Sequence, residues 1–404
     1  MGNLLFLAHR LPFPPNKGDK VRSYNLLRYL AARHRVFLGT FVDDPDDEQH
    51  VPAVRKLCAE VHAPRLHPRR ARIGSLQGLL RAEPLTLSYY RDASMTRWVQ
   101  RMLAHEPMDA ALVFSSSMAQ YAASFPGPVL MDFVDVDSAK WTGYASTHRW
   151  PLSWIYGREG RTLLAYEREV AANASHSFFA SEREATLFRG LAPESANRVG
   201  ALGMGVDAEF FSVDAVRVCP FAADEIPIVF TGAMDYWPNI DAVCWFVREV
   251  LPQLRQRRPS LRFHIVGRAP TAVVRALESE SVSVTGTVPD VRPYLQHAAV
   301  VVVPLRLARG VQSKVLEAMA MARPVVAAAA CVESIDVTPG EHLVSAADAA
   351  DYVEAVDTLL REPARAIAIG NAGRARVLEA YSWEAQLRSL DSHLTHLHAP
   401  GLAA

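Results

Sequence analysis

Residues 300–328 read VVVVPLRLARGVQSKVLEAMAMARPVVAA, and this stretch decides the fold. It begins with four valines, continues through a loop that contains Gly310, enters a helical pattern at Ser313 and ends in a second apolar run at 324–328. Short β-branched runs that alternate with helical patterns are typical of βαβ units, whose strands are parallel and buried under helices. The stretch therefore predicts one strand, helix, strand unit of an open α/β sheet.

The same alternation extends over most of the chain. Further strands are predicted in the second half at 226–232, 261–267 and 282–286, and in the first half at 3–8, 36–42, 110–115, 128–133 and 177–180. The hydrophilic run 43–49 is interpreted as a solvated loop. Because 404 residues are too many for one ordinary core, we predict an α/β protein with two Rossmann-like doubly wound domains facing a cleft. The predicted domains are 1–204 and 205–380, followed by a C-terminal helical segment, 381–404, that packs back on the first.

Composition places the chain among ordinary globular proteins. It has 43 Lys+Arg against 43 Asp+Glu and 50% hydrophobic residues, which excludes disordered and collagenous classes. The four cysteines stand far apart without a C-x-x-C pair, which favours a reducing cytoplasm over a disulfide framework or a zinc knuckle. No apolar run approaches the roughly 20 residues of a membrane helix, and the first residues do not resemble a signal peptide. We therefore expect a cytoplasmic protein.

Charge is distributed unevenly along the chain. Residues 55–101 carry ten basic and three acidic side chains, interleaved with leucines and a tryptophan. A basic, partly apolar surface of this kind can contact anionic lipid headgroups, so peripheral binding at the inner face of the cytoplasmic membrane is one interpretation. A solvated helical face is the other. The segment forms no recognisable nucleic-acid-binding module, so we expect no nucleic-acid partner.

The loop and helix within 300–328 predict an anion site. The first turn of a helix offers free backbone N–H groups, and Lys314 adds a positive charge there, which suits a diphosphate. Glu317, one turn later, could accept two hydrogen bonds from a vicinal diol such as a ribose. The alternative is a surface lysine and glutamate paired along one helix face.

Several segments resemble one enzyme family. Residues 313–320 (SKVLEAMA) and 323–326 (RPVV) resemble the donor-site helix of retaining family-4 glycosyltransferases, which have the two-domain GT-B fold. The resemblance continues at 203–210 (GMGVDAEF), 230–234 (FTGAM) and 264–267 (HIVG). Three more segments are similar to a subgroup of sugar transferases from bacterial exopolysaccharide loci linked to exosortase systems: 14–23 (PPNKGDKVRS), 132–141 (DFVDVDSAKW) and 234–239 (MDYWPN).

The resemblance implies roles for particular residues. It implies a nucleotide-sugar donor, most often a UDP sugar, on the second domain and an acceptor glycan on the first. The donor would contact Gly232, Gly267, Arg268, Gly310, Gln312, Ser313, Lys314 and Glu317. Gly18 would let the acceptor-side loop, Asn16, Lys17, Gly18 and Asp19, close over the phosphates. A plain turn is the alternative for each glycine.

The sequence departs from the family at three places. Where members commonly have the first glutamate of an E-x7-E pair, this chain has Arg309, which could bind diphosphate or an acidic sugar, or pair with a carboxylate. A basic pair common after the first strand of the second domain is also missing from 233–239, which places more of the phosphate neutralisation on Lys314.

The third departure is a missing histidine, and it leads to Asp135. Many members have a histidine near the end of the strand predicted at 128–133, and Asp135 is its positional substitute, able to accept a hydrogen bond from a sugar hydroxyl or help remove the acceptor proton. Asp135 and Asp137 also spell D-x-D, a metal-binding pattern of the other large glycosyltransferase fold. Two successive α/β domains argue against that fold, so we expect no metal and no cofactor, and Asp137 could instead cap a loop.

Together with the predicted anion site, the resemblance implies a retaining glycosyltransferase that moves a sugar from a nucleotide donor to a hydroxyl of a growing or lipid-linked exopolysaccharide glycan. Two alternatives stay open. A nucleotide-sugar 2-epimerase shares the two-domain plan but needs no acceptor. A nucleotide-sugar-binding component of a polysaccharide assembly would have lost its catalytic contacts, as Arg309 and the missing histidine suggest.

Overall fold

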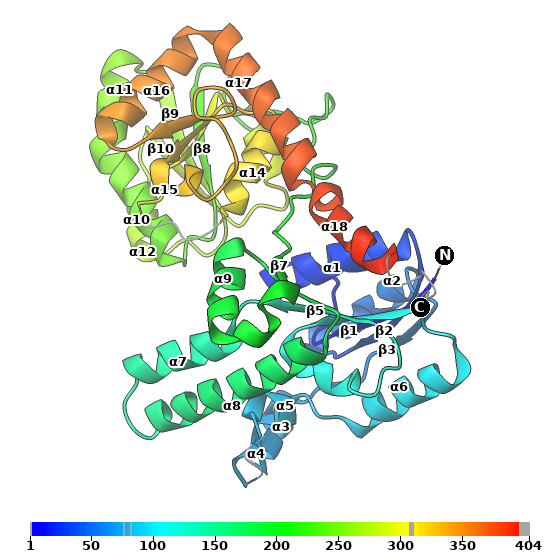
Figure 1. Cartoon of the computed structure of the whole chain (residues 1–404). Helices are drawn as coiled ribbons and strands as arrows, with labels where there is room; N and C mark the ends of the chain where they lie inside the picture. The colour runs from blue at the N-terminus through cyan, green and yellow to red at the C-terminus, as the bar shows by residue number, and fades with distance from the viewer. Residues whose placement is uncertain (1, 76, 81–82, 307–310, 396–404) are drawn as a thin grey trace. The chain divides into compact units, whose positions relative to one another are not determined.

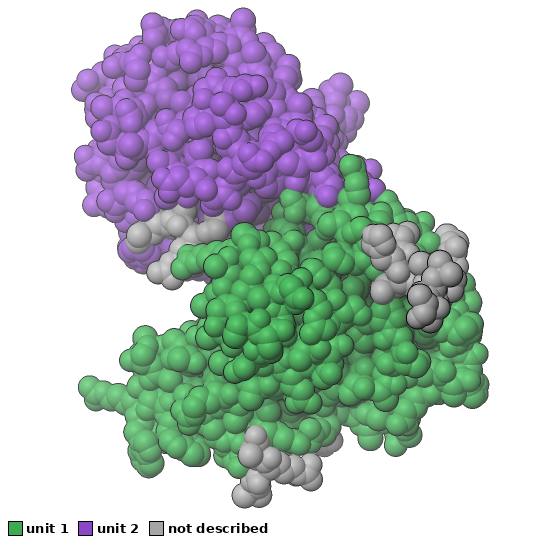
Figure 2. Space-filling model, viewed as in Figure 1, with its two compact units in different colours: residues 1–204, 386–404 green, residues 205–385 purple. Residues whose placement is uncertain are grey.

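The computed structural model describes residues 2–75, 77–80, 83–306 and 311–395. The chain forms two compact units (Figure 2). Unit 1 comprises Met1–Met204 together with Gln386–Ala404, and unit 2 comprises Gly205–Ala385. Each unit has its own sheet and its own hydrophobic core, so each is described separately.

Unit 1 is built on a parallel sheet with the strand order β3-β2-β1-β4-β5-β6-β7 over the described residues. The strands are β1 (Asn3–Ala8), β2 (Arg35–Thr40), β3 (Glu60–His62), β4 (Ala110–Phe114), β5 (Val129–Val134), β6 (His176–Phe179) and β7 (Val199–Ala201). The central strands are almost wholly apolar and buried because helices cover both faces. An open parallel sheet of this order places the ends of β1 and β4 at the switch point, where ligands of such folds bind.

The helices of unit 1 connect these strands (Figure 1). They are α1 (Gly18–Ala31), α2 (Val51–Arg55), α3 (Pro68–Ser75), α4 (Gln77–Leu80), α5 (Leu85–Tyr89), α6 (Ala93–His105), α7 (Asp137–Thr147), α8 (Leu152–Asn173) and α9 (Glu182–Leu191). Helices α7 and α8 form an antiparallel hairpin that extends away from the sheet (Figure 1). The last helix, α18 (Trp383–Thr395), enters unit 1 at Gln386, and there the Tyr29 hydroxyl donates a hydrogen bond of 2.7 Å to Asp391.

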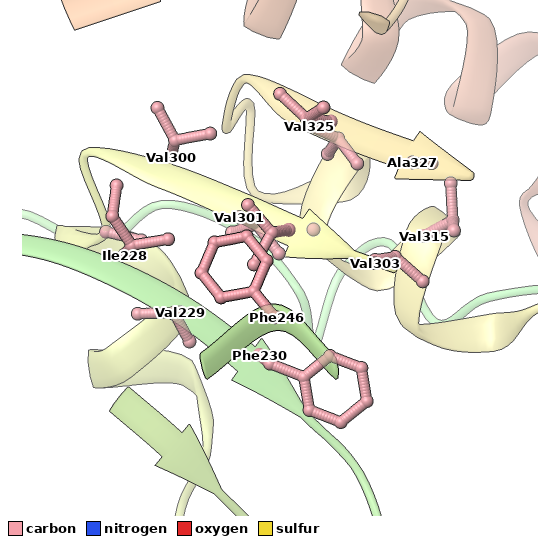
Figure 3. Close-up of a cluster of buried hydrophobic side chains, with 14 of the residues drawn as sticks. Ile228, Val229, Phe230, Phe246, Val300, Val301, Val303, Val315, Val325 and Ala327 are labelled. Carbon is pink, nitrogen blue, oxygen red and sulfur yellow. The ribbon is translucent and has the colours of Figure 1, made fainter. Parts of the chain in front are cut away.

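Unit 2 has a second parallel sheet with the order β10-β9-β8-β11-β12-β13 over the described residues. Its strands are β8 (Ile226–Thr231), β9 (Leu261–Val266), β10 (Val282–Gly286), β11 (Val300–Val303), β12 (Val325–Ala328) and β13 (Val344–Ala346). Figure 3 shows how Phe230 and Phe246 pack with the valines of β11 and β12. The valine run that opens 300–328 is completely buried, because Val300 to Val303 form a central strand between β8 and β12.

The helices of unit 2 lie around this sheet (Figure 1). They are α10 (Trp237–Trp245), α11 (Leu251–Arg257), α12 (Ala272–Arg275), α13 (Arg292–His297), α14 (Ser313–Ala320), α15 (Ala329–Val332), α16 (Ala349–Arg361) and α17 (Pro363–Arg376). Helix α14 is the one predicted from 300–328, and it leads directly into β12. In the part of the chain that the structure describes, no helix has both the length and the hydrophobicity needed to cross a bilayer.

The predicted fold class is confirmed: two parallel Rossmann-like sheets covered by helices. The interpretation of 43–49 as a solvated loop is correct for the exposed side chains of Asp46, Glu48 and Gln49, but not for Asp47 or for the backbone. Residues Pro45–His50 form a short 3-10 helix, and the carboxylate of Asp47 is buried against the equally buried ammonium of Lys20, with 2.5 Å between Nζ and Oδ2. A buried lysine needs a partner of opposite charge, and this acidic run supplies it.

Candidate functional site

In unit 2, the ends of β8 and β9 pack backbone against backbone at two glycines. The Gly232 amide donates to the Val266 carbonyl at 3.0 Å, and the Met234 amide donates to the Arg268 carbonyl at 2.8 Å. A Cβ on Gly267 would lie 1.7 Å from the Gly232 carbonyl oxygen, a distance that no side chain tolerates. Gly267 is therefore needed for the close approach of the two strand ends, a more specific reason than a plain turn.

Asn239 joins this pair of strand ends to helix α14. Its side chain is 3% exposed, its Nδ2 donates to the Ala233 carbonyl at 2.9 Å, and its Oδ1 accepts a hydrogen bond of 2.6 Å from Lys314 Nζ. Gly232 leaves room for this arrangement, since a Cβ there would lie 2.7 Å from Asn239 Nδ2. Asn239 was not predicted as a site residue, although it is the last residue of the segment 234–239 that carried part of the resemblance.

Lys314 and Glu317 lie half-buried, unlike a solvated surface pair. Burial lowers the pKa of Lys314 to about 8, against the opposing effects of Glu317 and Cys331. Burial likewise raises the pKa of Glu317, although Lys314 and a hydrogen bond from Ser313 act in the opposite direction. Lys314 Nζ also lies 5.1 Å from the centroid of the Phe230 ring. A partly desolvated ammonium beside the first turn of a helix is a strong site for an anion.

The remaining predicted donor residues of unit 2 lie at the start of α14, in the loop before it and after β9. Gln312 occupies the N-cap position of α14, and Ser313, its first residue, is exposed. Arg268 is exposed after β9, and its guanidinium makes no hydrogen bond or ion pair with the described residues. Arg309 and Gly310 lie outside the described residues.

In unit 1, the loop predicted to contact phosphate ends at the start of α1. Asn16, Lys17 and Gly18 are exposed, and Lys17 occupies the N-cap position of α1 without a side-chain capping bond. Asp19 accepts a hydrogen bond of 2.9 Å from Arg10 Nη1 and lies 3.4 Å from His9 Nε2. Although burial alone would raise the pKa of Asp19, His9 and Arg10 hold it well below its usual range. Asp19 therefore contacts both Arg10 and His9, and the exposed part of the loop is Asn16 to Gly18.

A pocket of about 230 Å³ opens within unit 1 at the carboxyl ends of its strands. It is lined by His9, Thr86, Tyr90, Ser115, Asp137, Lys140, Trp141 and Tyr144. His9 follows β1 and stacks on Phe114 with ring centroids 5.7 Å apart, while Ser115 follows β4 with a φ of 78°. A non-glycine residue held at positive φ is strained, and such strain is concentrated at functional sites. His9 and the aromatic pair Trp141 and Tyr144 were not selected from the sequence.

Asp135 and Asp137 share one lysine. Lys140 Nζ donates to Asp135 at 2.7 Å and to Asp137 at 3.1 Å, and the two carboxylates raise the pKa of Lys140 against the effect of burial. Asp137, but not Asp135, lines the pocket. Asp137 starts α7 and its carboxylate contacts Lys140, while the N-cap position of α7 belongs to Val136. Among the described residues, no group of three or more His, Cys, Asp and Glu side chains is arranged to hold a metal ion.

Two buried carboxylates of α8 accept hydrogen bonds from the first residues of α5 and α7, two helices that contribute residues to the pocket. Glu159 accepts hydrogen bonds from the amides of Leu85 and Thr86, at 2.7 and 2.9 Å, and so fixes the start of α5. Glu167 accepts from the amide and hydroxyl of Ser138 at the start of α7. Burial raises the pKa of Glu167 to about 8. The sequence did not predict that these two glutamates of α8 are buried against the first residues of α5 and α7.

A protein-family model matches most of unit 2. Residues 225–362 match the family model described as "Glycosyl transferases group 1". This match contains β8 to β12, the two glycines, Asn239 and helix α14. No curated protein matches the chain.

Solved structures match the chain over almost its whole length. Anabaena Alr3699/HepE in complex with UDP has 15% identity and a TM-score of 0.66, covering 98% of this chain and 100% of its own. Sucrose-phosphate synthase from Thermosynechococcus elongatus has 19% identity and a TM-score of 0.65, covering 99% and 100%. WaaG, a glycosyltransferase involved in lipopolysaccharide biosynthesis, has 15% identity and a TM-score of 0.59, covering 98% and 100%. At these identities the matches establish the two-sheet GT-B fold.

Proposed function

We propose that this chain, a GT-B protein with a group 1 glycosyltransferase sequence at residues 225–362, transfers a sugar with retention from a nucleotide donor to a glycan hydroxyl. The donor is most simply a UDP sugar, since Anabaena Alr3699/HepE has been crystallised with UDP and with UDP-glucose. The acceptor in this proposal is a lipid-linked or growing exopolysaccharide glycan. Membership of the exosortase-linked subgroup rests on the segments 14–23, 132–141 and 234–239.

The observation that carries the proposal is the Lys314–Asn239 hydrogen bond at the ends of β8 and β9. It holds a partly desolvated ammonium at the first turn of α14, where the backbone N–H groups also point outward. A diphosphate placed there would receive the lysine charge and these N–H groups together. Glu317, one turn along, then serves as acceptor for the ribose hydroxyls.

The chemistry follows from where charge develops. When the bond between the sugar and the diphosphate breaks, negative charge grows on the leaving phosphate and positive charge grows on the sugar ring. Lys314 and the start of α14 stabilise the leaving diphosphate, which is the main electrostatic contribution of unit 2. In the retaining reaction that the resemblance implies, the acceptor hydroxyl attacks from the face that the phosphate leaves, and the phosphate helps to accept its proton.

For the acceptor, we assign the pocket of unit 1. Its Trp141 and Tyr144 rings provide apolar faces for a sugar, and His9 and Asp137 provide groups that can bind hydroxyls. Asp135 stays a candidate for a catalytic carboxylate through its shared contact with Lys140. The loop of Asn16, Lys17 and Gly18 stays a candidate phosphate contact.

Saturation-transfer NMR against UDP, GDP and ADP sugars tests the donor site. We expect one nucleotide class to bind the native protein, and Lys314→Ala, Glu317→Ala and Asn239→Ala each to abolish the transfer signal. Lys56→Ala, which removes an exposed amine of unit 1, is the matched control and should leave the signal unchanged. Binding that survives all three substitutions would refute the assignment.

Product analysis tests the reaction itself. Glycan extension with the donor's anomeric configuration supports the proposal. An epimer of the donor sugar formed without acceptor would instead identify a nucleotide-sugar 2-epimerase. Donor binding with neither product would identify a binding component. We further propose that the reaction needs no metal or cofactor, so that activity persists in EDTA.

The proposed location is the cytoplasmic face of the inner membrane, with a peripheral contact through the basic segment 55–101. The support is the charge of that segment, in which Arg69 and Arg72 are exposed on α3. A protein that stays in the supernatant with anionic vesicles at low salt would contradict this contact.

A further inference from the structure

The tip of the α7–α8 hairpin exposes large apolar side chains. Trp150 is 81% exposed, Trp154 55%, Tyr144 50% and Leu152 44%. Tyr144 lies in the last turn of α7, Trp150 in the connection, and Leu152 and Trp154 in the first turn of α8. The hairpin extends away from the sheet of unit 1 (Figure 1), and its α7–α8 connection therefore lies at its outer end. Clustered exposed aromatics are rare on monomeric proteins and mark interaction surfaces.

The part of the hairpin around the α7–α8 connection, residues 138–158, carries formal charge of one sign. From Ser138 to Arg158 the sequence contains three basic residues and no acidic one. The neighbouring segment 61–82 contains five arginines and no acidic residue. The two segments are joined, because Arg158 of α8 donates to the carbonyls of Gly78 and Glu83, at 2.7 and 3.2 Å.

We propose that the tip of the α7–α8 hairpin, together with the exposed arginines of α3, docks on an anionic lipid bilayer. Tryptophan and tyrosine have an apolar ring and a polar edge, which suits them to the headgroup region of a bilayer. Arg149 at the tip and Arg69 and Arg72 on α3 are exposed and would contact lipid phosphates. The absence of acidic residues from both segments removes the repulsion that an anionic surface would otherwise meet.

This surface is independent of the donor site, because all of its residues belong to unit 1. The surface is connected to the proposed acceptor pocket, because Trp141 and Tyr144, which line the pocket, lie on α7, the helix that leads to the tip. A docked hairpin would therefore hold the pocket of unit 1 near the bilayer, where a lipid-linked glycan begins. Lipid binding can be measured without any nucleotide sugar, so its failure is distinguishable from failure of the proposed transferase activity.

Vesicle sedimentation tests the aromatic part. We expect the native protein to sediment with phosphatidylcholine–phosphatidylglycerol vesicles at low salt and not with phosphatidylcholine alone. Trp150→Ala/Trp154→Ala should weaken partitioning at least about tenfold, because two largely exposed indole rings lose their contact with the bilayer. Trp150→Phe/Trp154→Phe should retain most of it. Trp237→Ala removes a ring that is 58% exposed in unit 2 and should have no effect.

Charge reversal tests the electrostatic part. Arg149→Glu and Arg69→Glu/Arg72→Glu should each weaken partitioning, by roughly fivefold for each arginine. Arg275→Glu, an exposed arginine of α12, is the matched control. Thermal unfolding of each variant shows whether it is folded. Binding that ignores lipid charge, or that survives both the tryptophan and arginine substitutions, would overturn the proposal. So would self-association abolished by Trp150→Ala/Trp154→Ala, which would make a second copy the occupant.

Discussion

Lys314 is the residue whose titration reports most directly on the donor site. Its pKa is lowered to about 8, so the free site loses its ammonium as the pH rises above that value. Because a bound diphosphate favours the charged lysine, UDP affinity should fall roughly tenfold between about pH 7 and pH 9. Isothermal titration calorimetry across this range measures the loss. Lys314→Ala should bind weakly at every pH, and a native profile that is flat would contradict the role of Lys314.

Gly267 provides a test of the close packing between the ends of β8 and β9. Since a Cβ there would overlap the Gly232 carbonyl oxygen, Gly267→Ala should destabilise unit 2 by about 3 kcal/mol or more. Gly143→Ala is the control, because a Cβ on this helical glycine would meet no atom within 4 Å and should stabilise by about 0.5–1 kcal/mol. Urea unfolding measures both. Equal effects of the two substitutions would refute the packing explanation.

At the scale of single residues, the charged side chains of the donor site could be predicted, but the residues that hold them in place could not. Lys314 and Glu317 were found because they stand one turn apart in a helix after a glycine-containing loop. Asn239 was missed, because its role depends on a side chain reaching across from α10 to α14, and only the fold brings these helices together. His9 was missed for a similar reason, since a single histidine after a strand has no distinctive spacing.

Among the elements, α8 carries the most unusual titratable group. Glu167 is buried, and its pKa of about 8 is far above that of an unfolded glutamate. The folded state therefore holds an extra proton, so this contribution to stability is complete below about pH 4.5 and is lost as the pH rises through about 8. Glu167→Gln, which is always neutral, should gain stability relative to the native protein over that range, at up to about 1.4 kcal/mol per pH unit. Urea unfolding at several pH values checks this, and a constant difference would contradict it.

The longer elements were predictable because burial on both faces leaves a continuous apolar run. Strands β1, β4 and β11 follow directly from such runs. Strands β3, β7 and β13 have three residues each, too few for any periodicity to be recognised, and they were missed. The short helix at Pro45–His50 was missed because its acidic composition is also that of a solvated loop.

At the scale of the whole molecule, Arg22 connects three parts of unit 1 that are far apart in the sequence. It is completely buried, forms a two-point ion pair with Asp132 of β5 at 2.8 and 3.1 Å, and donates to the Gly203 carbonyl near the end of the first segment of unit 1. Arg22→Met should destabilise the protein by about 3–5 kcal/mol, because Asp132 is left buried without its partner. Arg22→Met/Asp132→Leu should be less destabilised than the sum of the single variants. Chemical denaturation of the full cycle measures the coupling, and additive effects would exclude it.

The two-sheet architecture could be predicted because the alternation of apolar runs and helical patterns begins anew after residue 226. The strand order within each sheet could not be derived from that alternation, since it depends on how crossovers pack. The position of the buried Arg22–Asp132 pair could not be derived either. Charged residues are ordinarily exposed, and nothing in the sequence distinguishes this arginine from those on the surface.

Unit 1 is made of two pieces of chain that are separated by the whole of unit 2. During synthesis the ribosome therefore delivers every residue of unit 2 before it delivers Leu387 and Leu390, which are completely buried in unit 1. The usual order, in which the first domain is finished first, is reversed. A nascent chain stopped after Ala385 would hold a complete sheet in unit 2, while unit 1 still lacked the segment that covers Tyr29. We therefore expect chaperones that recognise exposed apolar surface to bind unit 1, and to do so late in synthesis, when unit 2 is already complete.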